Sequence, residues 1–286
     1  MNIVLGDNRY GKAETRLLRV ARLDDRHEIR DLSVSITLAG DFEAAHVLGD
    51  NTNVLPTDTQ KNTVFAFAKE APVGEIEEFA LRLAWHFVRT SDRVREARVE
   101  VEEYPWAHVH VRGAPQPHSF VRTSAERRLT TVTCDGEDAT AVSGLADLVV
   151  LRSAGSEFRG FARDRYTTLQ ETGDRILATA INARWRFSGL NVQWAESFAE
   201  ARQALLEAFS LQQRSLSLQQ TLYEMATAVL KARPEIAEVR LEMPNKHHFA
   251  VDLAPFGLTN DNEVFHATDR PYGLIEATVR RAAAVG

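Results

Sequence analysis

The sequence predicts an α+β protein built from two tandem units, each an antiparallel sheet with helices on one face. Several stretches alternate apolar and polar residues, which is typical of strands with one solvent-facing side. Other stretches repeat apolar residues every three or four positions, as amphipathic helices do. The order strand, strand, helix, strand, strand occurs twice along the 286 residues, so we expect one unit over 1–139 and a second over 140–286.

Four segments carry the alternating pattern of strands. In residues 33–38 the apolar members are Val34, Ile36 and Leu38, with serine and threonine between them. The same alternation, now with charged or polar partners, recurs in residues 96–102, 181–187 and 238–243. Each segment is therefore expected to bury one face and leave the other in water.

Three segments carry the helical pattern, in which apolar residues recur on one face. The first has Ile76, Phe79, Leu83 and Phe87 at spacings of three or four, and the last has Leu218, Leu222, Met225 and Val229. Between them, a helix is expected over Ser197–Gln212, with Phe198, Leu205 and Phe209 facing inward. A sheet covered by such helices on one side keeps two open edges, which favours closure of several chains into a barrel.

Two polar segments lie beside predicted strands. "PTDTQKNT" at 56–63 precedes "VFAF" at 64–67, which we interpret as a strand. The octet is then either a polar turn, since Asp and Asn bond to their own backbone, or a group of short side chains that grip a small ligand. The second segment, "MPNKHHF" at 243–249, is interpreted as the connection between two strands.

The composition excludes several classes of protein. The chain is 44% hydrophobic and has a net charge of -6 without a block of Lys or Arg, which argues against nucleic acid as the main partner. The single cysteine, Cys134, permits no internal disulfide. No apolar run approaches the roughly 20 residues that span a bilayer. With no signal-like start and no peroxisomal address at its end, the sequence predicts a soluble cytoplasmic protein without membrane contact.

Motifs for metals, phosphates and nucleophiles are weak or missing. The close histidine pairs are His108 with His110 and His247 with His248, and neither has a nearby cysteine or a helical His-x-x-Glu partner. There is no GxxxxGK[ST] or GxGxxG loop and no nucleophile elbow. We therefore expect no metal site.

Six motifs occur in an order that resembles the urate oxidase (uricase) family, and they cover most of the chain. They are "YGKAETR", "TDTQKNT", "SEFRGFARDRYTTLQETGDRIL", "SLSLQQTLYEM", "MPNKHHF" and "DRPYGLIEAT". The resemblance is to cofactor-free enzymes of the bacterial type, built from tandem tunnelling-fold units. It implies oxidation of urate by O2 and water to 5-hydroxyisourate and hydrogen peroxide in purine degradation, by a homotetramer with active sites at interfaces between subunits.

The resemblance also implies the roles of individual residues. The catalytic group would be Lys12, Thr57 and His247, with Lys12 paired to Thr57. Substrate contacts would come from Thr57, the Asp58 backbone amide, Phe158, Leu169, Arg175, Leu218, Gln219 and Asn245. Pro56 departs from the family pattern, in which this position usually carries another small or apolar residue. It stiffens the approach to Thr57, because proline restricts Leu55 to extended geometry.

The residue types suit this chemistry. Urate is a flat anion rimmed by carbonyl and N–H groups, so a guanidinium can meet two acceptors and a primary amide can meet a lactam-like edge. A phenylalanine face stacks on the ring. A lysine can act as the base when burial lowers its pKa, with a threonine hydroxyl as the relay.

Other interpretations stay open at this point. Arg175 could be a surface salt-bridge residue, Gln219 a helix-terminal residue bonded to backbone, Phe158 a core residue and Lys12 a solvated lysine. The chain could instead be a different purine or pterin enzyme on the same fold, which commonly needs zinc or a helical glutamate. A catalytically silent purine-binding protein is the remaining alternative, although it would not need both Lys12 and Thr57.

Overall fold

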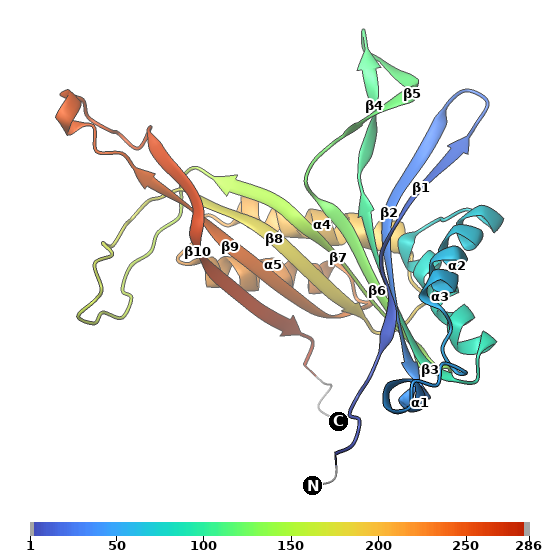
Figure 1. The fold of residues 1–286 in the computed structure, drawn as a ribbon. Helices are drawn as coiled ribbons and strands as arrows, with labels where there is room; N and C mark the ends of the chain where they lie inside the picture. The colour runs from blue at the N-terminus through green and yellow to red at the C-terminus, as the bar shows by residue number, and fades with distance from the viewer. Residues whose placement is uncertain (1–2, 283–286) are drawn as a thin grey trace. The chain divides into compact units, whose positions relative to one another are not determined.

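The computed structural model describes residues 3–282 of the chain. It divides the chain into two compact units (Figure 1). The first unit holds the chain up to Gly144 together with Arg186–Ala195, and the second holds Leu145–Trp185 and the chain from Glu196 onward. Below, they are called the first and the second unit.

The first unit is an antiparallel sheet with helices packed on it. Its elements are β1 (Tyr10–Arg22), β2 (His27–Gly40), α1 (Glu43–Val47), α2 (Thr57–Glu70), α3 (Ile76–Thr90), β3 (Val94–Tyr104), β4 (Trp106–Val111), β5 (Ala114–Arg122), β6 (Arg127–Cys134) and the start of β7 (Ala139–Arg152). The strand order is β1-β2-β3-β6-β7, and β4 pairs with β5 in a separate hairpin. Helix α3 packs on β3 and β6, while α2 packs on β1.

The second unit repeats this plan with fewer elements. It contains the remainder of β7, β8 (Leu177–Phe187), α4 (Trp194–Leu211), α5 (Leu218–Ala232), β9 (Ile236–Ala250), the short 3₁₀ helix η1 (Ala254–Phe256) and β10 (Phe265–Arg280). The strand order is β7-β8-β9-β10, and β9 pairs antiparallel with β10. Helix α5 packs on β9 and β10, and Figure 1 shows α4 and α5 on the same side of these strands.

The four predicted strands are confirmed, and their alternation separates core from surface. Val34 and Ile36 of β2 are almost fully buried, as are the apolar members of β3 and β9. In β8, Ile181 and Trp185 are buried while Arg184 faces solvent. Period-two patterning therefore places one face of each strand in the core, as expected.

The three predicted helices are also confirmed, with small differences at their ends. In α3 the predicted apolar residues from Ile76 to Phe87 are buried on one face of the helix. In α5 the same holds for the predicted apolar residues from Leu218 to Val229. Helix α4 begins at Trp194 and ends at Leu211, whereas Ser197–Gln212 was predicted. Mixed α+β architecture with helices on an antiparallel sheet is thus the fold of this chain.

The interpretation of residues 64–67 as a strand is wrong, because they lie in α2. Pro56 stands at the N-cap with φ −52°, and Asp58 bonds to Lys61 and to Asn62 on the next turn. Such pairs three and four positions apart stabilise a helix. The buried face of α2 is Gln60, Val64 and Ala68, and its polar first member hides the helical period from sequence analysis.

The interpretation of residues 243–249 as a connection is also wrong. They form the second half of β9, which runs without interruption to Ala250 and pairs with β10. The first unit also differs from the prediction in its helices, because it has three where the sequence indicated one.

In β9, the extended backbone at Pro244 is compatible with the proline ring, since proline is tolerated where a strand ladder is irregular. The register of the β9–β10 pair shifts between Thr268 and Gly273.

Each sheet ends in an edge strand, β1 in the first unit and β10 in the second. Within residues 3–282, neither unit closes into a barrel of its own. No helix in this part of the chain is long and apolar enough to cross a membrane.

A buried ion pair joins α3 to the sheet of the first unit. The Glu77 carboxylate is 1% exposed and accepts hydrogen bonds from Arg128 Nη2 at 2.7 Å and from the Ser143 hydroxyl at 2.6 Å. Arg128 also meets Glu75 at 2.6 Å. Burial raises the pKa of Glu77, and the charge of Arg128 and the hydrogen bond from Ser143 oppose that rise. The sheet–helix contact therefore depends on charge compensation as well as on packing.

We predict that Arg128→Ala lowers the free energy of unfolding by about 3–5 kcal/mol, because it leaves the Glu77 carboxylate buried without its cation. Losing that cation raises the folded-state pKa of Glu77 further above its unfolded value. Its protonated form is the cheaper one to bury, so the loss should be smallest at acid pH and should grow as pH rises through the folded-state pKa. Denaturant unfolding at several pH values measures this.

Arg240→Ala is the matched control, since Arg240 and Glu276 form an exposed pair at 3.0 Å. We expect it to change stability by less than about 1 kcal/mol. The double variant Glu77→Gln/Arg128→Met should remove most of the pH dependence. A loss in Arg128→Ala that is equal at acid and alkaline pH would contradict this account.

Candidate functional site

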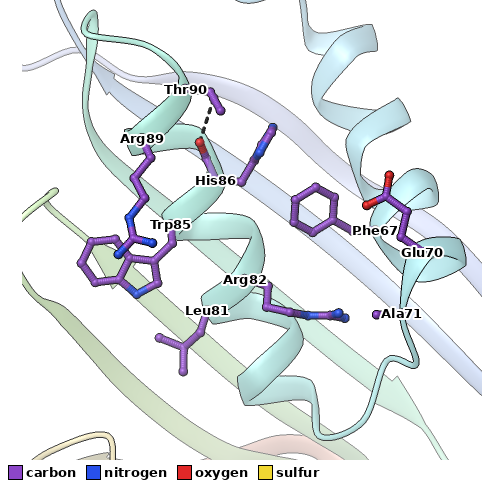
Figure 2. A pocket seen from close by; sticks show the side chains of 9 residues that line it. All are labelled: Phe67, Glu70, Ala71, Leu81, Arg82, Trp85, His86, Arg89 and Thr90. Carbon is purple, nitrogen blue, oxygen red and sulfur yellow. Dashed lines mark hydrogen bonds between the residues drawn. The ribbon is translucent and has the colours of Figure 1, made fainter.

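The hollow between α2 and α3 does not contain the predicted site residues. It measures about 500 Å³ and is lined by Phe67, Glu70, Ala71, Leu81, Arg82, Trp85, His86, Arg89 and Thr90. Figure 2 shows Phe67 of α2 facing His86 of α3, and the two rings meet at 4.9 Å between centroids. Arg89 lies over the Trp85 ring at 4.3 Å, so its charge is already engaged.

The "YGK" motif at the start of β1 organises the first unit's part of the candidate site. Tyr10 accepts a hydrogen bond from the Leu55 N–H at 2.8 Å, which ties the segment before Thr57 to β1. Gly11 lies so close to β2 that a Cβ would come within 1.8 Å of the Ile36 carbonyl oxygen. A larger residue than glycine cannot occupy this position without moving the strand. The motif thus fixes the position on β1 from which the Lys12 side chain projects.

Lys12 lies at a bulge in β1, next to the first turn of α2. The pairing register with β2 shifts between Lys12 and Thr15, and Glu14 has φ 55°. Bulges of this kind redirect side chains. The pKa of Asp58 is lowered chiefly by its hydrogen bond from Lys61, and the charge of Lys12 adds to this effect. The structure therefore brings Lys12 close to the start of α2, where Thr57 and Asp58 lie.

The first turn of α2 offers backbone N–H groups. Pro56 makes no side-chain cap, and the Gln60 N–H, which reaches the Pro56 carbonyl at 3.2 Å, closes the first helical turn. The N–H groups of the preceding residues have no intrahelical acceptor in an α-helix. Together with the helix dipole they favour a negatively charged or carbonyl-bearing ligand. Thr57 is half-buried and Asp58 exposed, both at this end.

Arg175 and Phe158 form the centre of the second unit's part. The Arg175 guanidinium lies over the Phe158 ring at 5.2 Å, and Phe158 stacks on Phe161 at 5.0 Å with planes 12° apart. Burial lowers the pKa of Arg175. Its Nε is buried and has no hydrogen-bond partner among residues 3–282. A half-buried cation with an unused donor beside an aromatic face is suited to a flat anion.

The segments that carry this pair are held by backbone hydrogen bonds. The Phe158 N–H donates to Thr172 O at 3.0 Å and the Thr172 N–H donates back to Phe158 O at 3.1 Å. The Arg175 N–H donates to Ser156 O at 2.8 Å. Arg175 thus lies in an ordered loop rather than on a helix, and no ion pair involves it within the described part of the chain.

Gln219 is the second residue of α5, at the helix's capped N-terminus. The Ser217 side chain accepts from the Gln220 N–H at 3.2 Å, and Gln220 Oε1 accepts from the Leu216 N–H at 3.1 Å, an arrangement related to the capping box. This leaves the Gln219 side chain exposed. Leu218 is only 2% exposed and packs in the core, whereas Leu169 is 51% exposed in its loop.

Asn245 and His247 lie on β9, two residues apart and therefore on the same side of the strand. Both are half-buried, and His247 stacks on Phe249 at 5.6 Å. His248 points to the other side, where its Nδ1 lies 3.1 Å from Lys246 O. Geometry thus groups His247, not His248, with Asn245.

The structure places some predicted site residues near one another and adds one residue, and the roles of these residues stay predictions. The charge of Lys12 acts on Asp58, Arg175 lies over Phe158, and Asn245 shares a face of β9 with His247. Within residues 3–282, Gln219 and Leu169 make no hydrogen bond or ring contact with these groups. Sequence analysis missed Tyr10, which positions the segment before Thr57, although it stands within the "YGK" motif that drew attention to Lys12.

Metal ligands do not gather in the described residues. No group of three or more His, Cys, Asp or Glu side chains is placed there to hold a metal ion. His108 Nδ1 is 2.7 Å from Gln116 O and His110 Nδ1 is 3.1 Å from His108 O, so both imidazoles serve the β4–β5 hairpin.

Comparison with known proteins gives a consistent result along the whole chain. A family model described as Uricase matches residues 8–133 and 141–276. A relative named uricase from Arthrobacter globiformis is 51% identical over 279 residues, covering 98% of this chain and 90% of the relative. A uricase from Aspergillus flavus is 36% identical over 291 residues, covering 96% of each.

Solved structures agree with this. The crystal structure of uricase from Arthrobacter globiformis matches with a TM-score of 0.95 at 50% identity, covering 100% of this chain and 98% of that one. A uricase from Bacillus fastidious matches with a TM-score of 0.82 at 21% identity, over 96% of this chain and 93% of that one, which supports the fold alone.

Proposed function

The chain belongs to the uricase family, and we propose that it oxidises urate with O2 and water to 5-hydroxyisourate and hydrogen peroxide. Urate loses two electrons in this reaction, O2 gains them to become hydrogen peroxide, and water supplies the new hydroxyl group. The enzyme is an oxidoreductase of purine catabolism. A cytoplasmic location remains a prediction.

One structural observation carries the assignment to this site. Arg175 is a half-buried cation whose buried Nε lacks a hydrogen-bond partner among residues 3–282, and it lies over the Phe158 ring. Urate is flat, anionic and bears carbonyl acceptors on its rim. It would stack on Phe158, satisfy the unused donor and compensate the buried charge. A neutral or non-planar ligand would do only part of this.

Substrate binding is divided between two edges of the ring in this proposal. Arg175 grips one edge as a planar fork, and Gln219 meets the other with an amide that both donates and accepts. Leu169 and Leu218 line the pocket. Leu218 is a core residue in the single chain, so its role would be to support the turn that carries Gln219.

The remaining site residues are assigned to proton transfer and to the reaction with oxygen. We assign the base to Lys12, with the Thr57 hydroxyl as the relay and the Asp58 N–H as a donor to the ligand. The free N–H groups at the start of α2 support this, since they favour negative charge on the substrate. Asn245 and His247 complete the oxygen side, and their common face on β9 supports that grouping. Electron-rich urate, once deprotonated, reacts with O2 directly, so the proposal needs no cofactor.

The complete site is proposed to form between two chains of a homotetramer. Lys12, Thr57 and Asp58 belong to the first unit, and the other assigned residues belong to the second. The edge strands also favour assembly. Leu18 of β1 is 60% exposed and Leu274 of β10 is 54% exposed, which is costly on an unpaired edge. Each two-fold interface would build two identical composite sites.

We predict urate-dependent peroxide formation by protein dialysed against a chelator. Oxygen consumption, peroxide formation and loss of urate's ultraviolet absorbance should remain in step. Metal content of the active sample is measured in parallel. Loss of activity on chelation, with recovery on adding zinc, copper or iron, would show that the cofactor-free assignment is incorrect.

We predict that Arg175→Ala raises KM for urate by about 10- to 100-fold, since the lost charged hydrogen bonds act in ground and transition states alike. Lys12→Ala should instead lower kcat by about 100-fold or more, because it removes the proton acceptor. Steady-state kinetics with urate separates the two effects. Lys69→Ala, an exposed lysine at the other end of α2, is the control and should match the unmodified enzyme. An unchanged kcat in Lys12→Ala removes Lys12 from the mechanism.

We predict that Lys12→Ala and Arg175→Ala chains, each of low activity alone at urate concentrations far below the raised KM of Arg175→Ala, regain activity at those concentrations when mixed. A composite site takes Lys12 from one chain and Arg175 from the other, so random mixing restores about a quarter of the sites. Co-refolding in equal amounts, with native mass spectrometry to verify hybrid oligomers, makes the test. If hybrids form and remain as inactive as their parents, the site lies within one chain.

A further inference from the structure

A short hydrogen-bonded ladder connects the two ends of the proposed substrate grip. The segment 155–158 lies at its centre, bonded to Arg175 through Ser156 O at 2.8 Å. On its other side it pairs with Ser215: the Ser215 N–H donates to Gly155 O at 2.9 Å, and the Glu157 N–H donates to Ser215 O at 2.8 Å. Ser215 stands four residues before Gln219. The ladder therefore links Arg175 and Gln219 by main-chain contacts.

Thr221 fastens this ladder to α5. It is 0% exposed, and its hydroxyl donates to Gln212 Oε1 at 2.7 Å. The Ser215 hydroxyl lies 2.7 Å from the same Thr221 oxygen, and Ser215 is also fully buried. Both hydroxyls also lie 3.2 Å from Ser217 O, so Ser215, Thr221, Gln212 and Ser217 form one hydrogen-bonded cluster. An apolar side chain could not hold this junction in the same way, because Gln212 Oε1 would lose its donor and the Ser215 hydroxyl would keep only Ser217 O as a partner.

The proposed site does not use Thr221, yet Thr221 lies two residues from Gln219 in the same helical turn. The capping bonds of Ser217 and Gln220 set the direction of that turn. The Thr221 hydroxyl joins the same turn to Ser215 of the ladder, which is bonded through residues 155–157 to Arg175. Substrate grips of this kind tolerate displacements of only about half an ångström.

We propose that Thr221 is a positioning residue, which fixes Gln219 relative to Arg175 through its hydrogen bonds to Ser215 and Gln212. This inference rests on the proposed function, since it concerns the binding of urate by Gln219. Thr221 itself touches no substrate. Its hydroxyl controls urate affinity and not the proton-transfer step.

The test compares Thr221→Val with Thr221→Ser in the full-length enzyme. Valine keeps the shape and removes the hydroxyl, while serine keeps the hydroxyl. Thr221→Val should raise KM for urate by about 5- to 10-fold, the effect of one lost buried hydrogen bond, with kcat within about twofold. Thr221→Ser should stay within about twofold of the unmodified enzyme in both constants.

Thr179 provides a matched control in the same unit. It is fully buried in β8, and its hydroxyl has no hydrogen-bond partner within the described residues. Thr179→Val is the same substitution at a buried position outside the ladder, so KM should not change. Thermal unfolding of all variants verifies that KM is compared between folded proteins.

A double-mutant cycle with Gln219→Ala separates positioning from general damage. In the Gln219→Ala background, Thr221→Val should change KM by less than about twofold, because the group that it positions is gone. The proposal is overturned if Thr221→Val leaves KM unchanged, or if its effect is equally large in both backgrounds.

Two further measurements keep the result unambiguous. If Thr221→Val does not fold, Ser215→Ala replaces it, because it removes the hydroxyl that is hydrogen-bonded to Thr221. Ser215→Ala should give the same KM increase and the same cycle. A wild-type KM in Ser215→Ala overturns the proposal. Urate oxidation by the unmodified enzyme is measured first. Without it the proposed function fails and this inference with it, whereas an active enzyme with an indifferent Thr221→Val variant refutes this inference alone.

Discussion

A sheet that is covered by helices on only one face is the constraint on which the rest of this structure depends. The buried faces of β2, β3, β8 and β9 supply the core, and their alternation leaves the opposite face without cover from the same unit. Apolar side chains such as Leu18 and Leu274 stay exposed on the edge strands. Burial of these side chains by other chains would give the proposed assembly and the proposed division of the site between chains the same physical origin.

Apart from Asn245 and His247, which lie within β9, the candidate site residues lie in loops, at a bulge or in the first turn of a helix. Thr57 and Gln219 lie in the first turns of α2 and α5, where backbone N–H groups lack intrahelical acceptors. Lys12 lies at a bulge, and Arg175 in a loop held by backbone hydrogen bonds. Rigid strands and helices thus place each group, while the irregular backbone at their ends exposes it to a ligand.

The sequence was sufficient for the core and insufficient for α2. Val34 and Ile36 could be predicted as core residues because burial of one strand face imposes an apolar period of two. The buried face of α3 could be predicted because a helix imposes a spacing of three to four. Helix α2 buries Gln60 in the position where an apolar residue would reveal the helix, and its stability comes from Pro56 at the start and the pairing of Asp58 with Lys61. These are local polar contacts that a hydrophobic period does not record.

The same limit applies to the site. Individual residues could be assigned from motifs, since the six motifs keep the order of the family. What the motifs do not encode is geometry at a distance, such as the Tyr10 hydroxyl reaching Leu55 across 45 residues. Side chains that act through a neighbour carry no motif of their own, because their role is defined only once the chain has folded.

The environment of Arg175 disfavours folding, and a bound ligand would compensate for this. Burial lowers the pKa of Arg175, yet a guanidinium remains protonated at any ordinary pH, so the folded chain retains a half-buried cation with an unsatisfied Nε. Folding alone gains nothing from this. An anionic ring stacked on Phe158 would supply both the missing acceptor and the missing charge. The stabilisation that the free chain does not gain at Arg175 is then gained when the ligand binds. Unsatisfied groups of this kind are expected at a ligand site.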